Sequence, residues 1–328
     1  MSILILSHKH DHSTADVMDW IYCLGGEVTR INYSSVTALL KAEIGSDKDI
    51  VILVENKEYK ISDFNSFWYR NGNINFNNAL QGYTGPADFS NEVMHHLHAE
   101  ARALSNLIIY KLEQKKRIGS FNLSEPNKLI VLEMAKLYGL QTPHTLITSR
   151  KDQLVEFHKI TKNLIYKAIS DSISVKCDDG YLGFFTERLT ESILNQLPQL
   201  FFPTLFQEEI TKKYELRIFY LEDKFYPMAI FSQNDSSTQV DFRRYNKAKP
   251  NRTVPYSLPK VIVSKLLMLT KAMNINSGSI DMIVDNNNNY VFLEINPVGQ
   301  YGMVSHPCNY FIDKKIAQFL VTCENSSL

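Results

Sequence analysis

Hydrophobic and polar positions in the first third of the chain alternate between strand and helix patterns. An apolar run predicts a buried strand at residues 2–7, and a helix at residues 14–25 ends at two glycines. Further strands are predicted at residues 27–32 and 51–55. Because strands that alternate with helices form parallel sheets, we expect a βαβ unit here. Polar residues 8–12 stand where a dinucleotide-binding chain carries its glycines, which excludes a nicotinamide-type site.

The rest of the chain begins with helical patterns and then turns to strands. Helices are predicted at residues 91–111 and 127–139, and a closing helix at residues 310–322. The predicted strands between them are residues 164–169, 205–210, 215–221, 225–231, 279–284 and 290–296. The fold class that these patterns indicate is α/β (α+β), with boundaries near residues 120 and 200.

The charges of the chain cancel, which excludes several classes of partner. The 328 residues include 35 Lys and Arg and 35 Asp and Glu, so no net field attracts nucleic acid or an anionic membrane. No apolar run is long enough for a signal peptide or a membrane span. The four cysteines lie far apart without a metal-ligand spacing, which fits a reducing compartment. We therefore expect a cytoplasmic protein with no nucleic-acid or membrane partner.

The composition is globular but poor in glycine. With 44% hydrophobic residues the chain can bury a core in two or three subdomains. Glycine supplies 13 of 328 residues, below the average of about 7%. A nucleotide site built on a long glycine-rich loop is therefore not expected.

Two predicted strands near the C-terminus carry an acidic pair. Asparagines 286–289 tolerate the backbone angles of a tight turn, so the strands on either side should form an antiparallel hairpin. A turn centred between the second and third asparagines places Asp281 opposite Glu294, and Ser279 opposite Asn296. Because side chains alternate with a period of two, all four residues then share one face.

This arrangement of oxygen atoms predicts a magnesium site. Two carboxylates opposite one another, about 4.5–5.5 Å apart at Cβ, repel unless a positive charge lies between them. Carboxylate and amide oxygens suit Mg²⁺, which binds one or two carboxylates together with phosphate oxygens. Asp281, Glu294 and Asn296 are therefore predicted metal ligands. The alternative is a solvated strand face that carries polar residues by chance.

The hairpin sequences Ser-Ile-Asp-Met-Ile-Val and Phe-Leu-Glu-Ile-Asn-Pro resemble the metal-binding hairpin of the ATP-grasp superfamily. In that superfamily the acids and the amide hold two Mg²⁺ ions against the phosphates of ATP. Further segments are similar to the family's first and second lysines, its adenine-binding hinge and its ribose-binding acid. The residues that the resemblance assigns to ATP are Lys128, Lys167, Glu208, Glu209, Ile210 and Glu215.

The resemblance also implies an ATP-grasp fold in three parts. Residues 1–120 would form an N-terminal βαβ pre-ATP-grasp domain, and residues 121–200 the central subdomain with the lysine strand and a lid loop. Residues 201–328 would form the C-terminal subdomain with the hinge and the metal hairpin. The predicted lid, residues 170–183, has only two glycines and carries two aspartates that would repel phosphate, so its phosphate contacts are in doubt while a lid role stays open.

The predicted ATP contacts have physical explanations and structural alternatives. Lys128 at a helix N-terminus and Lys167 in an apolar strand can each approach phosphate as a point charge. The alternative for Lys128 is a surface lysine in the first helical turn, and for Lys167 an edge-strand lysine that faces water. A hinge strand can present backbone groups to the adenine edge, with Glu208 accepting from the exocyclic amine and Ile210 packing on the ring. The alternative is an ordinary alternating strand.

A narrower resemblance is carried by Ser-Phe-Trp-Tyr-Arg at residues 66–70, Asp-Phe-Arg-Arg-Tyr at 241–245 and Asn-Pro-Val-Gly-Gln-Tyr at 296–301. These segments are similar to the ATP-grasp peptide maturases that make graspetides, such as the microviridin ligases, and especially to the grasp-with-spasm type. The resemblance implies a ribosomal precursor peptide as substrate, recognised through its leader. Asp or Glu side chains would be activated as acyl phosphates, and Thr or Ser hydroxyls would close ω-esters. Some relatives use a Lys amine and form an amide.

Three residues are candidates for the chemical step. Attack on an acyl phosphate creates an oxyanion that an arginine can stabilise, and Arg217 and Arg244 are the candidates. The structural alternative for Arg217 is an ion pair with Glu215 or Glu222, and for Arg244 a surface position. Asp241 is the candidate base for the hydroxyl, with a solvated turn as its alternative.

Peptide contacts and metal-binding histidines are less specifically indicated. Arg70, Tyr220 and Tyr226 are tentative peptide-binding residues, with core packing as the alternative for the two tyrosines and a structural role for Arg70. Residues 8–12 include three histidines and an aspartate, for which a polar loop after a strand is favoured over a metal site. The histidines at residues 95–98 lack the spacing of a zinc pair and are expected to be exposed.

Two other functions are compatible with the same residues. One is an ATP-grasp ligase of small amino acids, which needs a closed acceptor pocket. The other is an ATP-binding module without catalysis, against which the complete set of acids and lysines argues. A homodimer is expected from the family resemblance alone.

Overall fold

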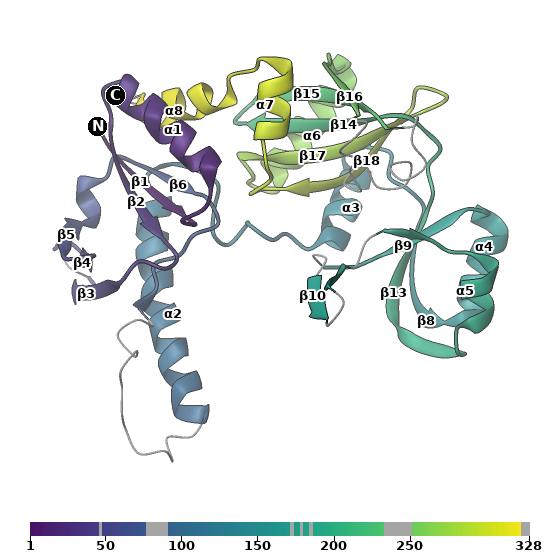
Figure 1. Cartoon of the computed structure of the whole chain (residues 1–328), viewed down its shortest axis with the longest axis horizontal. Coiled ribbons are helices and arrows are strands. Elements are labelled where there is room, and N and C mark those ends of the chain that lie inside the picture. The colour runs from purple at the N-terminus through teal and green to yellow at the C-terminus, as the bar shows by residue number, and fades with distance from the viewer. Residues whose placement is uncertain are drawn as a thin grey trace.

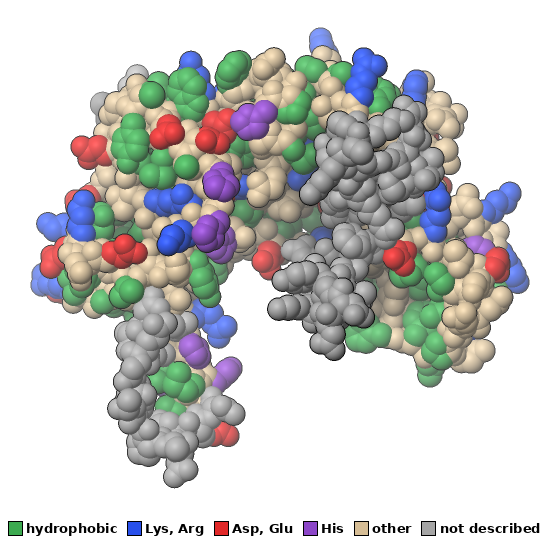
Figure 2. All heavy atoms as spheres, viewed as in Figure 1, with side chains coloured by type: hydrophobic (Ala, Val, Ile, Leu, Met, Phe, Trp, Pro, Cys, Tyr) green, Lys and Arg blue, Asp and Glu red, His purple; other side chains and the backbone are tan. Residues whose placement is uncertain are grey.

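The computed structural model describes residues 1–45, 48–76, 91–170, 174–177, 180–183, 186–232 and 251–322. Three parts form an arch, in which the N-terminal and central parts are the sides and the C-terminal sheet lies between them (Figure 1). The space-filling view shows the molecule hollowed beneath this sheet (Figure 2). Within the described ranges, no helix has the length and apolarity needed to cross a membrane.

The N-terminal part is built on a parallel sheet with the strand order β2-β1-β6-β7. Residues 3–6 of β1 are fully buried because side chains on both faces of the strand are covered. Ile3 and Ile5 pack against α1, and Leu4 and Leu6 pack in the core that includes α2. The predicted βαβ unit is confirmed, since β1 and β2 pair in parallel. These elements are β1 (Ser2–Ser7), α1 (His12–Cys23), β2 (Glu27–Asn32), β6 (Ser66–Tyr69), α2 (Asn91–Glu113) and β7 (Lys116–Ile118).

The strand predicted at residues 51–55 exists but does not belong to the parallel sheet. It is the middle strand of a small antiparallel sheet with the order β3-β4-β5. The strand that extends the parallel sheet is β6, whose four side chains are all buried and therefore show no alternation in the sequence. The bounds of the small sheet and the 3₁₀ turn that follows it are β3 (Thr37–Lys41), β4 (Val51–Val54), β5 (Lys57–Lys60) and η1 (Ile61–Asp63).

The central part contains an antiparallel sheet with the order β12-β9-β13-β8, against which α4 and α5 pack. The sheet includes β13 and so continues to Glu208, past the predicted boundary at residue 200. A separate hairpin pairs β10 with β11. The elements are α3 (Lys128–Leu137), β8 (Thr145–Arg150), α4 (Lys151–Thr161), β9 (Leu164–Lys167), β10 (Ser174–Cys177), β11 (Gly180–Gly183), β12 (Glu187–Arg188), α5 (Glu191–Gln196) and β13 (Leu200–Glu208).

The C-terminal part is a five-stranded antiparallel sheet with the order β16-β15-β14-β17-β18. On one face, Leu216, Ile218 and Ile280 pack against α3 and α6 in a shared core. The other face is polar around Arg217, while Phe219 on this same face packs with the N-terminal part. The elements are β14 (Lys212–Leu221), β15 (Lys224–Phe231), β16 (Arg252–Pro255), α6 (Lys260–Ala272), β17 (Ser277–Asp285) and β18 (Tyr290–Asn296).

The C-terminal helices α7 (Gly302–Cys308) and α8 (Ile312–Val321) return to the N-terminal part. Ile316 and Leu320 of α8 share one hydrophobic core with Ile3 of β1 and Ile21 of α1. In Figure 1 α8 accordingly lies beside α1. The two ends of the chain are therefore held in one packed unit, which fixes the C-terminal sheet next to the N-terminal sheet.

Candidate functional site

The acidic hairpin has the predicted register at its functional end. Asp281 of β17 lies opposite Glu294 of β18, and Ser279 lies opposite Asn296. Nearer the turn the pairing differs by one residue, because Val284 lies opposite Tyr290 and an irregularity separates the two registers. The turn itself follows from Asp285, whose carboxylate accepts hydrogen bonds from two backbone N–H groups of the asparagine run. Beyond the irregularity, Asp281 therefore lies opposite Glu294, as a symmetric turn would also have placed it.

A row of three charged residues crosses the C-terminal sheet. Arg217 on β14 lies opposite Asp281, and Asp281 lies opposite Glu294. Arg217 Nη1 donates to Asp281 Oδ2 at 2.6 Å. The side chains of Arg217 and Asp281 are 12% and 17% exposed. Water therefore screens this pair only partly, and the positive charge expected near the two acids is supplied by Arg217.

Glu215 and Glu222, which the sequence offered as alternative ion-pair partners of Arg217, bind other residues. Glu222 accepts a hydrogen bond from Asn276, and Glu215 is bound by other residues. The strand pairing explains this, because the residue directly across from Arg217 on β17 is Asp281. The Nε atom of Arg217 is buried and has no hydrogen-bond partner among the described residues. The guanidinium therefore retains a donor for a further acceptor.

Glu215 lies in a buried ion pair on the same face. Its carboxylate is bonded to Lys212 Nζ and accepts from Ser232 Oγ at 3.0 Å. Burial raises the pKa of Glu215 above its usual range, although Lys212 and the Ser232 hydrogen bond act in the opposite direction. Glu215 thus has two partners within the chain, and its assignment to ribose remains a prediction.

The two predicted phosphate lysines lie on the elements that were expected to carry them. Lys128 is the first residue of α3, and its Nζ donates to Ser170 O at 3.1 Å. Lys167 is the last residue of β9 and is half-buried. Both therefore lie near the start of the predicted lid loop, and both remain predicted phosphate contacts.

The cap of α3 gives a test of how Lys128 is positioned. Asn127 Oδ1 accepts from the N–H groups of Leu129 and Ile130, which fixes the first turn. We expect Asn127→Ala to lower the free energy of unfolding by about 1 kcal/mol and to raise the KM for ATP. Denaturant unfolding and steady-state kinetics measure the two effects. Asn127→Ser retains a capping oxygen, and a loss as large as that of the Ala variant would contradict this role of the cap.

The predicted adenine hinge is the connection between two sheets. Residues 206–210 lead from β13 of the central sheet to β14 of the C-terminal sheet. Glu208 accepts from His144 N at 3.2 Å, and Glu209 forms an ion pair with Arg188 at 2.6 Å. Ile210 is half-buried. The hinge is thus placed between two sheets, while both carboxylates already have partners within the chain.

Arg70 is a buried connection between the N-terminal part and the loop after β18. It is 4% exposed, and its guanidinium forms an ion pair with Asp11 at 2.9 Å. Burial raises the pKa of Asp11, but Arg70 and nearby hydrogen bonds outweigh this and hold that pKa below its usual value. The other acceptors of Arg70 are Val298 O, Gly299 O, Ser13 Oγ and Gln300 Oε1. Peptide binding by Arg70 remains a prediction.

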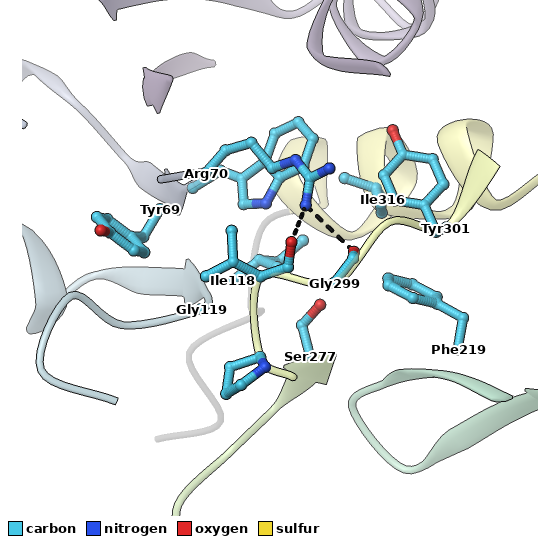
Figure 3. A pocket seen from close by; sticks show the side chains of 12 residues that line it. Tyr69, Arg70, Ile118, Gly119, Phe219, Ser277, Gly299, Tyr301 and Ile316 are labelled. Atoms are coloured by element: carbon cyan, nitrogen blue, oxygen red, sulfur yellow. Dashed lines mark hydrogen bonds between the residues drawn. The ribbon is translucent and has the colours of Figure 1, made fainter. Parts of the chain in front are cut away.

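Figure 3 shows Arg70 above a small cavity between the parts, with hydrogen bonds to the loop after β18. The cavity is about 10 Å³, close to the space that one water molecule needs. Tyr301 lies beside the guanidinium, whose carbon is 5.5 Å from the ring centre. This region is therefore packed protein interior without room for a peptide side chain.

The remaining predicted residues have different surroundings. Tyr220 is 2% exposed and stacks on Phe225, and half-buried Tyr226 packs against Tyr310. Both therefore have the core contacts that the sequence offered as their alternative. Asp241 and Arg244 lie outside the described residues.

The residues of the hairpin fit a magnesium ion by their chemistry. The strand register brings the carboxylates of Asp281 and Glu294 and the amide of Asn296 to one face, and all supply oxygen. Asn296 Oδ1 accepts one hydrogen bond, from Val298 N at 3.1 Å, and retains a second lone pair. In the described part of the chain no three His, Cys, Asp or Glu residues form a metal-binding group. The two acids and the amide of the hairpin remain predicted metal ligands.

The pairing of Lys212 with Glu215 and the contact between Arg217 and Asp281 are features that the sequence analysis missed. The first has no signal in the strand period, because residues three apart lie on opposite faces of a regular strand. An irregularity in the register between Lys212 and Tyr214 accompanies the pairing of Lys212 with Glu215. The second has no local signal, since 64 residues separate the partners.

Comparison with known proteins rests on structure. No protein-family profile and no curated protein sequence matches the chain. Macrocyclase MdnC of Microcystis aeruginosa, solved with its precursor peptide MdnA, is 26% identical with a TM-score of 0.78, over 98% of this chain and 100% of that one. A RiPP-associated ATP-grasp ligase of Chryseobacterium gregarium, solved with ADP and a leader and core peptide, is 23% identical with a TM-score of 0.80, over 97% and 95% of the two chains.

A more distant likeness concerns the fold alone. D-alanyl-alanine synthetase A of Vibrio cholerae is 12% identical with a TM-score of 0.58, over 98% and 96% of the two chains. The TM-scores of the macrocyclase and of the RiPP-associated ligase are thus higher than that of the synthetase. The chain has the ATP-grasp ligase fold, in the form that characterises the ATP-grasp peptide maturases.

Proposed function

We propose that the protein is an ATP-dependent peptide macrocyclase. It activates Asp or Glu side chains of a ribosomal precursor as acyl phosphates and joins them to Thr or Ser hydroxyls as ω-esters. The observation that carries this proposal is the row of Arg217, Asp281 and Glu294 on one sheet face. The likeness over almost the whole chain to MdnC, a macrocyclase solved with its precursor peptide, supports it. ATP and ribosomal peptides are both made in the cytoplasm, where we place the reaction.

Phosphoryl transfer needs positioning and charge neutralisation. Asp281, Glu294 and Asn296 would hold Mg²⁺, with two ions expected, and Mg²⁺ supplies positive charge beside the phosphates of ATP. Lys128 and Lys167 would bind the phosphates, and the hinge at residues 208–210 would hold adenine. A substrate carboxylate oxygen attacks the γ-phosphorus, the bond to the bridging oxygen breaks and ADP leaves.

Ring closure is the second step. The hydroxyl oxygen attacks the acyl carbon, its proton passes to a base, and inorganic phosphate leaves as the ester forms. We propose that Arg217 stabilises the oxyanion. Its hydrogen bond to Asp281, a predicted metal ligand on the neighbouring strand, supports this role. Arg244 and Asp241 remain proposed as a second arginine and the base.

Mass spectrometry tests the proposal. A candidate precursor, encoded near this gene and containing Thr and Glu or Asp repeats, is incubated with enzyme, ATP and Mg²⁺. We expect the loss of one water per ring, reversed by mild base. If the peptide loses water and mild base does not restore the original mass, the linkage is an ω-amide formed by a Lys amine instead of an ester. Turnover of ATP with free amino acids and none with the peptide would contradict the proposal, and a homodimer stays a separate prediction.

A further inference from the structure

An open pocket lies between the N-terminal part and the loop after β18, outside the hairpin and the predicted hinge. Its volume is about 390 Å³, within the usual range for small-ligand sites. It lies where β1 and β6 end, and the carboxyl ends of parallel strands are a frequent position for binding sites. We call it the histidine pocket. Its lining residues are His8, His10, Asp11, His12, Ser13, Arg70, Asn71, Val298 and Gln300.

The fixed charges around the histidine pocket are positive on balance. Asp11 and Arg70 neutralise one another in the mostly buried ion pair. Arg30 adds a second arginine, since its Nη2 donates to the carbonyl oxygens of His8 and Asp11 beneath the pocket. Asp11 is the one acid among the lining residues that the structure describes. The local field therefore favours an anion, although the whole chain has no net charge.

The histidines supply hydrogen-bond donors at the surface of the pocket. His8, His10 and His12 are all exposed. An imidazole N–H can donate to a carboxylate in either protonation state, whereas the buried Arg70 already has five acceptors. The available donors are thus those of the histidines, Asn71 and Gln300.

The pocket and the predicted metal site share a loop. Val298 and Gln300 line the pocket and lie two and four residues after Asn296. The backbone oxygen of Gln300 accepts from Ser279 Oγ at 3.0 Å, and Ser279 pairs with Asn296. A side chain at Gly299 would approach Ser279 Oγ to 2.6 Å, so this loop packs closely against the hairpin. A ligand in the pocket therefore lies beside the hairpin.

We propose that the histidine pocket binds a carboxylate side chain of the peptide substrate through His8, His10 and His12. This inference rests on the proposed function, because it takes the substrate to be an acidic peptide. The pocket would then select peptides with acidic residues near the reacting side chain. It is separate from the predicted phosphate contacts, which lie on α3 and β9.

The test is a titration of the full chain with ring-labelled histidine, followed by NMR without ATP. The probe is the blocked dipeptide acetyl-Glu-Asp-amide, and acetyl-Gln-Asn-amide is its uncharged counterpart. We expect saturable shifts of the His8, His10 and His12 signals with a Kd of about 1 mM, and little change for the three histidines of α2, His95, His96 and His98. Equal shifts with the uncharged dipeptide, or no saturable shift at these three residues, would overturn the proposal.

Histidine variants and a titration with inorganic phosphate extend the test. His10→Gln combined with His12→Gln should weaken binding of the acidic dipeptide about tenfold, whereas His96→Gln on α2 should leave it unchanged. Inorganic phosphate that binds at the same residues more tightly than the dipeptide would overturn the proposal in favour of a phosphate site. The titration measures binding alone, and mass spectrometry measures ring formation separately. Binding of the acidic dipeptide together with no ring formation would therefore support the pocket and contradict only the macrocyclase function.

Discussion

Replacing Asp281 with Asn is expected to reduce ATP-dependent ring formation at least about a hundredfold. The substitution keeps the shape and one oxygen but removes the charge that would bind Mg²⁺ and that now pairs with Arg217 at 2.6 Å. The rate of product formation at saturating ATP and increasing Mg²⁺ measures the effect. We also expect weaker Mg²⁺-dependent binding of ADP, which calorimetry detects in the absence of turnover.

Glu294→Gln separates the metal role of the hairpin from its contact with Arg217. Glu294 lies across from Asp281 on the far side from Arg217, so this variant leaves the 2.6 Å pair in place. We expect it to lose activity to a similar degree. The control is Asp223→Asn, because Asp223 is 66% exposed and pairs with Lys271 alone in the described part of the chain. If Glu294→Gln forms rings at the wild-type rate, the assignment of Glu294 as a Mg²⁺ ligand is wrong.

Replacing Lys212 with Met is expected to lower the free energy of unfolding by about 3–5 kcal/mol. Lys212 and Glu215 have side chains only 5% and 10% exposed, so the variant leaves the carboxylate buried without its cation. Chemical denaturation measures the loss. Lys213→Met is the matched control, since the neighbouring Lys213 is exposed and bonds to Asn288 at the hairpin turn.

The same variant should have a characteristic pH dependence. Burial already raises the pKa of Glu215 above its ordinary value of 4.5, and loss of Lys212 raises it further. At a pH between the pKa of Glu215 in the unfolded variant and its higher pKa in the folded variant, the folded state holds a proton that the unfolded state has released. The stability of the variant therefore falls as the pH rises through this range. The destabilisation should therefore be larger at neutral than at acidic pH. A loss independent of pH, or no recovery in Lys212→Met combined with Glu215→Leu, would contradict the buried-charge explanation.

The sequence predicted the acidic hairpin well because its determinants are local. The asparagine turn and the period of two place Asp281, Glu294, Ser279 and Asn296 on one face. The prediction of a symmetric turn was wrong in detail, since Asp285 binds two N–H groups of the run and shifts the nearby pairing by one residue. The irregularity that compensates depends on packing across the whole sheet, which a local pattern does not contain.

Elements without a simple alternation were predicted less well. All four side chains of β6 are buried, so its sequence lacks the strand period. The all-apolar sequence of β4 does not show that burial alternates along this strand. Helix α6 was not predicted, because its valines, isoleucine and leucines form an almost continuous apolar run. In each case the surroundings of the element, rather than its own sequence, determine which sheet or layer it joins.

The sequence by itself determined the βαβ start and the hairpin with its acids, because each depends on neighbouring residues. Only the tertiary structure decided which charges meet. Arg217 pairs with Asp281 because β14 lies beside β17, and Arg70 reaches Val298 across 228 residues of sequence. The same packing of the N-terminal part against the loop after β18 forms the histidine pocket. Such contacts follow from strand order and domain packing, which no local pattern encodes.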